Sequence, residues 1–245
     1  MLSGFYTAGS GILNQQRNIN VIGNNIANNQ TAGYRTQKMV SKTYEQNNLY
    51  RLEYGKYTHI GEGDPAVITD VVDSIFDESY LKETESPYDI AIVGEGYFNV
   101  QGNNNTYLTR NGNFNIDAEG YLILEGVGRV QGRNGALHVG GADYTITTHG
   151  MVYDNEHNYV DRILITQPAD NADIKKMDNG FFIADNADIV ENATVYQNEL
   201  EQSNVDMNEE YTSLMEAQRA LQACATAMRE IDAMNAKAAT LASIN

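Results

Sequence analysis

The stretch that decides the fold is residues 206–245, which read DMNEEYTSLMEAQRALQACATAMREIDAMNAKAATLASIN. The chain has neither glycine nor proline after Gly180, and ten alanines lie between Ala217 and Ala242. Alanine has the best helix propensity, whereas glycine and proline are the strongest helix breakers. The stretch therefore predicts one helix of about 39 residues, roughly 58 Å long at 1.5 Å per residue.

Two alternative caps are expected at the start of this helix. Ser203 and Asp206 have the spacing of a capping box, and Asp206 can also cap the helix with Glu209 three residues later. Either arrangement predicts that the helix begins near Met207.

Two rows of residues repeat every seven positions along the predicted C-terminal helix. The first row is Met207, Leu214, Leu221 and Met228, and the second is Ala217, Cys224, Ile231 and Ala238. A seven-residue repeat is typical of a coiled-coil seam, and small residues in the second row favour close approach of a partner helix. An amphipathic core helix shows similar rows, but one of this length is hard to bury on a small domain.

The N-terminal segment has a matching repeat. Its row is Phe5, Ile12, Ile19 and Ile26, with Leu2, Tyr6, Leu13 and Ile22 beside it. Seven asparagines lie between Asn14 and Asn29, and we interpret their amides as groups for contacts with neighbouring molecules, which a single chain would leave to water. This helix is expected to be marginal alone and to end near the Thr31–Gly33 turn.

The middle of the chain, from about Ile60 to Val195, has the pattern of β structure. Apolar and polar residues alternate around Ile90, Ile116 and Ile146, and twelve of the 21 glycines lie between Gly94 and Gly150. We predict an α+β fold in which long N- and C-terminal helices pair as a coiled coil around a central antiparallel β domain. The expected domains are an N-terminal polymerisation helix at 1–35, a connecting segment at 36–75, the β domain at 76–195 and a C-terminal polymerisation helix at 196–245.

Composition argues against several partners. The 16 basic and 33 acidic residues give a net charge of −17, which repels phosphate backbones and anionic lipid headgroups. We therefore expect no nucleic acid and no membrane insertion. Cys224 is the single cysteine, so no intrachain disulfide is expected, and the N-terminal segment lacks the basic and apolar regions of a secretory signal.

The candidate chemical motifs are weak. Gly61, Gly63 and Ala66 have the spacing of a dinucleotide-binding loop, but a strand-like run rather than a helix follows, so we favour a turn. His149 and His157, with nearby aspartates, lack the spacing of a metal site. We expect no catalytic, cofactor-binding or metal-binding residues, and hence no enzyme activity.

Four segments nevertheless resemble those of the flagellar rod and hook proteins. They are NNIANNQTAGYR at 24–35, PYDIAIVGEGYF at 87–98, TRNGNF at 109–114 and EQSNVD at 201–206, the last followed by QRA at 218–220. The resemblance covers essentially the whole chain. Within this family it favours the proximal rod protein, with the distal rod protein second.

The resemblance implies a structural subunit of the bacterial flagellar basal-body rod, outside the cytoplasmic membrane in the periplasm or cell wall. Its implied partners are other copies of itself, neighbouring rod or hook proteins and the flagellar type III export apparatus. The alternatives are a secreted β-rich adhesin or cell-wall-binding module, and a cell-wall hydrolase. The predicted assembly interface comprises Phe5, Ile12, Ile19, Asn24, Asn25, Ile26, Asn28, Met207, Leu214, Ala217, Leu221, Cys224, Met228 and Ile231.

Overall fold

The computed structural model describes residues 2–43, 47–53, 55–63, 67–75, 79–102, 105–168, 174–177, 180–184 and 186–242. The chain folds into two compact units. Unit 1 comprises residues 1–27, 36–75 and 206–245, and unit 2 comprises residues 28–35 and 76–205. The predicted α+β class is confirmed, because one helix lies at each end of a β-rich chain.

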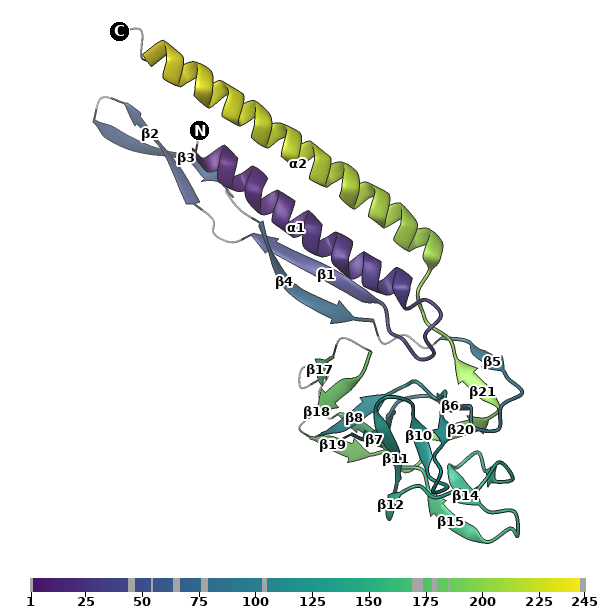
Figure 1. The fold of residues 1–245 in the computed structure, drawn as a ribbon. Helices are drawn as coiled ribbons and strands as arrows, with labels where there is room; N and C mark the ends of the chain where they lie inside the picture. The colour runs from purple at the N-terminus through teal and green to yellow at the C-terminus, as the bar shows by residue number, and fades with distance from the viewer. Residues whose placement is uncertain are drawn as a thin grey trace. The chain divides into compact units, whose positions relative to one another are not determined.

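Unit 1 contains both helices, α1 (Leu2–Ala27) and α2 (Met207–Ala242), which lie side by side (Figure 1). The Oδ1 atom of Asp206 accepts hydrogen bonds from the backbone N–H groups of Asn208, at 2.8 Å, and Glu209, at 3.3 Å. Asp206 is therefore the cap of α2, which confirms the second of the two predicted arrangements. No helix in the described part of the chain is both long enough and apolar enough to span a membrane.

Unit 1 also contains four strands. They are β1 (Gln37–Thr43), β2 (Asn47–Glu53), β3 (Lys56–Gly63) and β4 (Val67–Ser74). β1 pairs antiparallel with β4, and β2 pairs antiparallel with β3. The sequence pattern indicated strands only from about Ile60, but the structure has strands from Gln37 onward. The pairing register of β1 shifts between Val40 and Ser41, both of which are exposed, and Oγ of Ser41 accepts a hydrogen bond from Asn14 of α1, so the strand shows no regular apolar alternation.

Unit 2 is built from short antiparallel strands. They are β5 (Leu81–Glu83), β6 (Ile90–Val93), β7 (Tyr97–Gln101), β8 (Thr106–Thr109), β9 (Asn115–Ile116), β10 (Leu122–Leu124), β11 (Gly128–Gly132), β12 (Gly135–Ala136), β13 (Thr145–Ile146), β14 (Met151–Tyr153), β15 (Tyr159–Arg162), β16 (Ile165–Pro168), β17 (Ile174–Lys176), β18 (Phe182–Ala184), β19 (Ala187–Ile189), β20 (Thr194–Gln197) and β21 (Glu199–Glu201). Within the described residues, ten of them form one sheet: seven follow the path β17-β18-β8-β7-β11-β10-β9, β12 pairs with β11, and β16 pairs with β7 and β19. Smaller sheets are β13-β14-β15, β20-β6 and β21-β5.

The core of unit 2 follows the predicted alternation only in part: Ile146 is buried next to exposed Thr145, whereas Ile90, Ala91 and Ile92 are all buried. Ile90, Phe98, Leu122 and Val152 are fully buried, and Phe98 packs edge-on against Phe114 with ring centroids 5.1 Å apart. A smaller cluster joins Tyr97, Leu108 and Phe182. The predicted antiparallel β domain is present, and Asn134 lies in the tight turn between β11 and β12.

Candidate functional site

The two helices of unit 1 pack antiparallel in one register. A Cβ atom placed on Gly4 would lie 3.4 Å from Cδ1 of Ile231, and one placed on Gly11 would lie 3.0 Å from Sγ of Cys224. Moving seven residues forward along α1, from Gly4 to Gly11, therefore moves the contact seven residues toward the N-terminus of α2, from Ile231 to Cys224. The α1 glycines allow the close approach that the sequence pattern had assigned only to small residues of α2.

The predicted interface residues on α2 lie on one side of the helix. Ala217 is buried, and the others are half-buried: Met207, Leu214, Leu221, Cys224, Met228 and Ile231. On α1, Ile12, Ile19 and Ile26 are half-buried, whereas Phe5 and Asn24 are exposed. Asn28 lies in the turn after α1, where its backbone oxygen accepts a hydrogen bond from the N–H of Thr31.

Asn25 joins three elements inside unit 1. Its side chain is only 1% exposed; Nδ2 donates to the backbone oxygen of Gln37 at 2.9 Å, and Oδ1 accepts from the N–H of Gln37 at 3.0 Å. Nδ2 also lies 2.8 Å from Oε1 of Glu210 on α2, which continues the register of the helix pair. The amide therefore binds both backbone groups of Gln37 in β1, one through its donor and one through its acceptor.

Burial raises the pKa of Glu210, and the neighbouring charge of Glu209 raises it further. The hydrogen bond from Asn25 and the charge of Lys38 oppose this shift of the pKa. Lys38 on β1 lies 3.2 Å from Glu209 in an exposed ion pair. The junction of α1, β1 and α2 therefore contains a buried carboxyl group whose ionised form is disfavoured.

Asn14 makes a similar connection further along α1. Its Nδ2 donates to Oγ of Ser41 at 3.0 Å, and its Oδ1 accepts from Oγ1 of Thr69 at 3.2 Å. Asn14 thus links α1 to both β1 and β4. For Asn14 and Asn25 the sequence interpretation was wrong, because these amides find their partners within the chain rather than on a neighbouring molecule.

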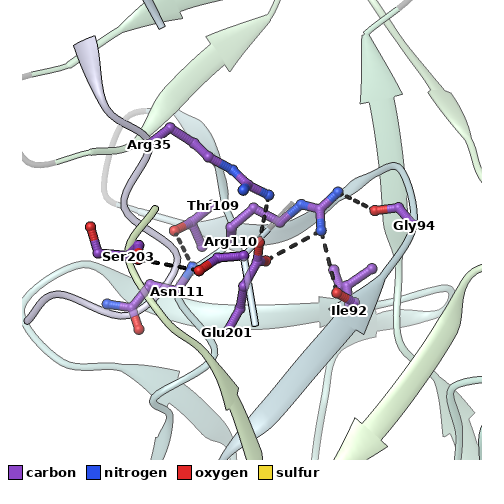
Figure 2. Close-up of polar contacts among 9 residues, drawn as sticks. Arg35, Ile92, Gly94, Thr109, Arg110, Asn111, Glu201 and Ser203 are labelled. Carbon is purple, nitrogen blue, oxygen red and sulfur yellow. Dashed lines mark hydrogen bonds and ion pairs between the residues drawn. The ribbon is translucent and has the colours of Figure 1, made fainter. Parts of the chain in front are cut away.

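Unit 2 contains a buried ion cluster that sequence reasoning missed (Figure 2). Oε1 of Glu201 lies 2.6 Å from Nη2 of Arg35, and its Oε2 lies 3.4 Å from Nη1 of Arg110. The side chains of Arg35 and Glu201 are 2% and 3% exposed. Arg110 also donates to the backbone oxygens of Ile92, at 3.4 Å, and Gly94, at 2.5 Å. Two guanidinium groups therefore share one carboxylate out of contact with water.

The electrostatics of the cluster follow from its burial. Burial lowers the pKa of Arg110, and the charge of Arg35 lowers it further, while Glu201 opposes the shift. Burial raises the pKa of Tyr97, whose ring lies under the Arg110 guanidinium with 5.4 Å between the guanidinium carbon and the ring centroid. Glu201 and Tyr97 thus provide the environment that keeps Arg110 in the interior.

Close backbone packing fixes the same region. The N–H of Gly33 donates to the backbone oxygen of Glu201 at 2.8 Å. Gly33 has a φ of 66°, and a Cβ atom on it would lie 2.3 Å from the carbonyl carbon of Arg110. Only glycine fits this position. Residues 33–35, 110 and 201, which belong to three separate segments of the sequence, therefore meet in unit 2.

The other candidate motifs have structural explanations. The turn that we favoured at Gly61 and Gly63 is wrong, because both residues pair with β2 within strand β3; Ala66 lies outside the described residues. Oδ1 of Asp154 accepts from the N–H groups of Glu156 and Asn158 and so closes a turn next to His157. Among the described residues, no group of three or more His, Cys, Asp or Glu side chains is placed to hold a metal ion.

Three family models match the chain. Residues 5–35 match a flagella basal body rod protein model, residues 91–180 match the D1 domain of the flagellar hook protein FlgE/F/G, and residues 196–241 match the C-terminal model of the flagellar basal body rod FlgEFG proteins. Together the matched ranges include the helix pair and most of unit 2. The family models therefore agree with the resemblance seen in the sequence motifs.

Curated relatives match over nearly their whole length. The flagellar basal-body rod protein FlgG of Agrobacterium fabrum is 32% identical over 87% of this chain and 89% of the relative. FlgG of Bacillus subtilis is 29% identical over 91% and 92%, and the rod protein FlgF of Caulobacter vibrioides is 29% identical over 87% and 86%. Overall identity thus does not separate FlgG from FlgF.

Proposed function

Since this chain belongs to the flagellar basal-body rod protein family, we propose that it is a structural subunit of the rod that polymerises through its terminal helices. Its role as a rod subunit follows from the family. We assign polymerisation to residues 1–35 and 196–245, with the helices of neighbouring subunits completing a coiled coil. The role is structural rather than catalytic, in keeping with the rod-protein names of the relatives.

The observation that carries this proposal is the apolar surface that unit 1 leaves exposed. Tyr6 and Leu13 of α1 are 65% and 62% exposed, and they lie seven residues apart on one face of the helix. Met234 and Leu241 of α2 are also largely exposed. Exposed apolar patches on a folded unit mark surfaces that a partner covers.

The β2–β3 hairpin adds to this surface. Tyr50 pairs with His59 and Leu52 pairs with Tyr57 across the two strands, so these side chains share one face. Tyr50, Leu52 and Tyr57 are all more than half exposed. An isolated two-stranded hairpin is marginally stable in water, and cover from a neighbouring subunit would stabilise it.

We further propose that the flagellar type III apparatus exports the chain, and that the assembled subunit lies in the periplasm or cell wall. Its partners are other copies of itself and neighbouring rod or hook proteins. Within the rod we favour the proximal position, which the sequence motifs suggested. These assignments rest on the family and on the exposed helical surfaces described above.

Isolation of basal bodies from cells that carry this chain with a tag in unit 2 tests the proposal. The turn at residues 154–158 is an exposed site for the tag. Electron microscopy should locate the tag along the rod shaft, near its membrane-proximal end. Secretion of the chain should stop when the flagellar export apparatus is deleted. A chain that is absent from purified basal bodies would exclude the rod function.

A further inference from the structure

Unit 2 has a groove of about 480 Å³ whose walls come from the 24–35 segment, the region of β5 and the 199–206 segment. Asn29 and Gln30 line it from the N-terminal segment, Gln202 and Ser203 from the C-terminal segment, and Tyr80 and Lys82 from the region of β5. Backbone pairing explains the positions of Tyr80, Lys82 and Gln202, and Ser203 accepts a hydrogen bond from the N–H of Val205, but within the described residues the side chains of Asn29, Gln30 and Gln202 have no such role. Their arrangement in a concave surface requires a separate explanation.

The amide side chains in this groove have free hydrogen-bonding capacity. In the part of the chain that the structure describes, no residue accepts from or donates to the side chains of Asn29, Gln30 or Gln202. Each carboxamide carries two donor hydrogens and an acceptor oxygen. Three such groups in one groove can bind the N–H and C=O groups of an extended peptide.

The 24–35 segment shows this mode of binding elsewhere. Asn25 binds the backbone of Gln37 through both atoms of its amide, at 2.9 and 3.0 Å. Asn29 and Gln30 follow it within the same segment and line the groove, and their amides have no hydrogen-bond partner in the described chain. The chemistry that Asn25 uses inside unit 1 is thus available in unit 2 for a second molecule.

The paired strands β5 and β21 present one face to the groove, with Tyr80, Lys82 and Gln202 on it. β5 pairs with β21, where the N–H of Gln202 donates to the oxygen of Tyr80 at 3.1 Å and the N–H of Thr84 donates to the oxygen of Asn198 at 2.7 Å. Within the described residues β5 has no strand on its other side. The backbone groups on that side belong to Leu81 and Glu83, which do not line the groove, so the groove binds a segment through side chains.

We propose that this groove binds an extended segment of a second copy of this chain in the assembled rod. Lys82 is the charged residue in the lining, and a chain with net charge −17 offers acidic segments that complement it. This inference rests on the proposed rod function, because polymerisation supplies the second copy at high local concentration. Tyr80, which is 73% exposed, lies at the groove and would contact the bound segment.

Photo-cross-linking tests the inference. The photoreactive residue p-benzoylphenylalanine replaces Tyr80 in the full chain, and basal bodies are isolated after irradiation. The expected product joins two copies of the chain, and mass spectrometry should identify an extended segment of the second copy at the cross-link. The double variant Asn29→Asp with Gln202→Glu removes amide donors and adds negative charge, so the yield of this product should fall at least tenfold.

The control is Asn155→Asp, which adds a negative charge to an exposed turn of unit 2 outside the groove. It should leave the yield unchanged, and all variants should unfold at the same temperature as the native chain. Cross-links only to another protein, no cross-link in basal bodies that contain the chain, or an unchanged yield in the double variant would each overturn the inference. If basal bodies lack the chain, the rod function fails, and cross-linking of the concentrated purified chain then decides whether the groove binds a second copy.

Discussion

Glu201→Ala removes the carboxylate that two buried guanidinium groups share. Because Arg35 and Arg110 are 2% and 6% exposed, water cannot replace that carboxylate. Removing one partner of a buried ion pair costs about 3–5 kcal/mol. For a unit of this size, we therefore expect the melting temperature of unit 2 to fall by roughly 10–20 °C. Near-ultraviolet circular dichroism of the unit 2 tyrosines would follow the unfolding.

The charge balance of the cluster makes a sharper test possible. Arg35→Met leaves one cation and one anion, Arg110 and Glu201, whereas Glu201→Ala leaves two cations with no anion between them. Arg35→Met should therefore destabilise unit 2 less than Glu201→Ala. Glu199→Ala is the matched control, since Glu199 lies on the same strand, β21, and is half-buried. Equal melting temperatures for Glu201→Ala and Glu199→Ala would refute this reasoning.

Three further predictions concern unit 1. Gly23→Ala should stabilise α1 by about 1 kcal/mol, because nothing lies within 4 Å of the added methyl group. Gly11→Ala places a methyl group 3.0 Å from Sγ of Cys224, so thermal melts should show it to be less stable than Gly23→Ala. Adding Cys224→Ala to Gly11→Ala removes this contact and should restore the lost stability. The pKa of Glu210 is higher in the folded chain than in the unfolded chain. The protonated carboxyl therefore contributes to the folding free energy below the unfolded-state pKa of Glu210, and this contribution is lost as pH rises through its folded-state pKa. Glu210→Gln should therefore gain stability over the native chain as pH rises toward neutral in denaturant titrations, and a constant difference at every pH would contradict this assignment. Leu221→Asp and Ile19→Asp should each abolish motility while unit 2 stays folded, because a carboxylate in a packed helix pair costs several kcal/mol; normal rods at normal abundance in either variant would show that the residue is not at an assembly surface.

The sequence predicted the elements with strong periodicity. The heptad rows of α2 mark its less exposed side, and the alternation around Ile90 and Ile146 marks β6 and β13. Both signals arise because apolar side chains recur with the period of the element that buries them. The α+β class and the antiparallel β domain could therefore be read from the residues alone.

Polar packing was harder to predict. β1 and β4 meet α1 partly through Asn14, Ser41 and Thr69, so the buried face of these strands lacks an apolar period. The register between α1 and α2 depends on glycines, which have no side chain and so add nothing to a hydrophobic pattern. Their spacing of seven, at Gly4 and Gly11, was the signal that could have identified them.

The ion cluster was hidden for a different reason. Arg35, Arg110 and Glu201 are far apart in sequence, and charged side chains are normally expected at the surface. Each nevertheless belongs to a segment that resembles the rod and hook proteins. Two of these segments combine the arginine with a nearby glycine, Gly33 or Gly112, which permits close backbone approach. That combination is the signal in the sequence that points to a buried polar contact.

The two units use the same pair of chain segments in different ways. In unit 1, Asn25 near the end of α1 binds Glu210 near the start of α2. In unit 2, Gly33 and Arg35 bind Glu201, a few residues before α2. The chain between these anchors is short on both sides, so forming one contact raises the effective concentration of the partners in the other. The N- and C-terminal segments should therefore associate cooperatively, and the loss of Glu201 should also weaken the contact between Asn25 and Glu210.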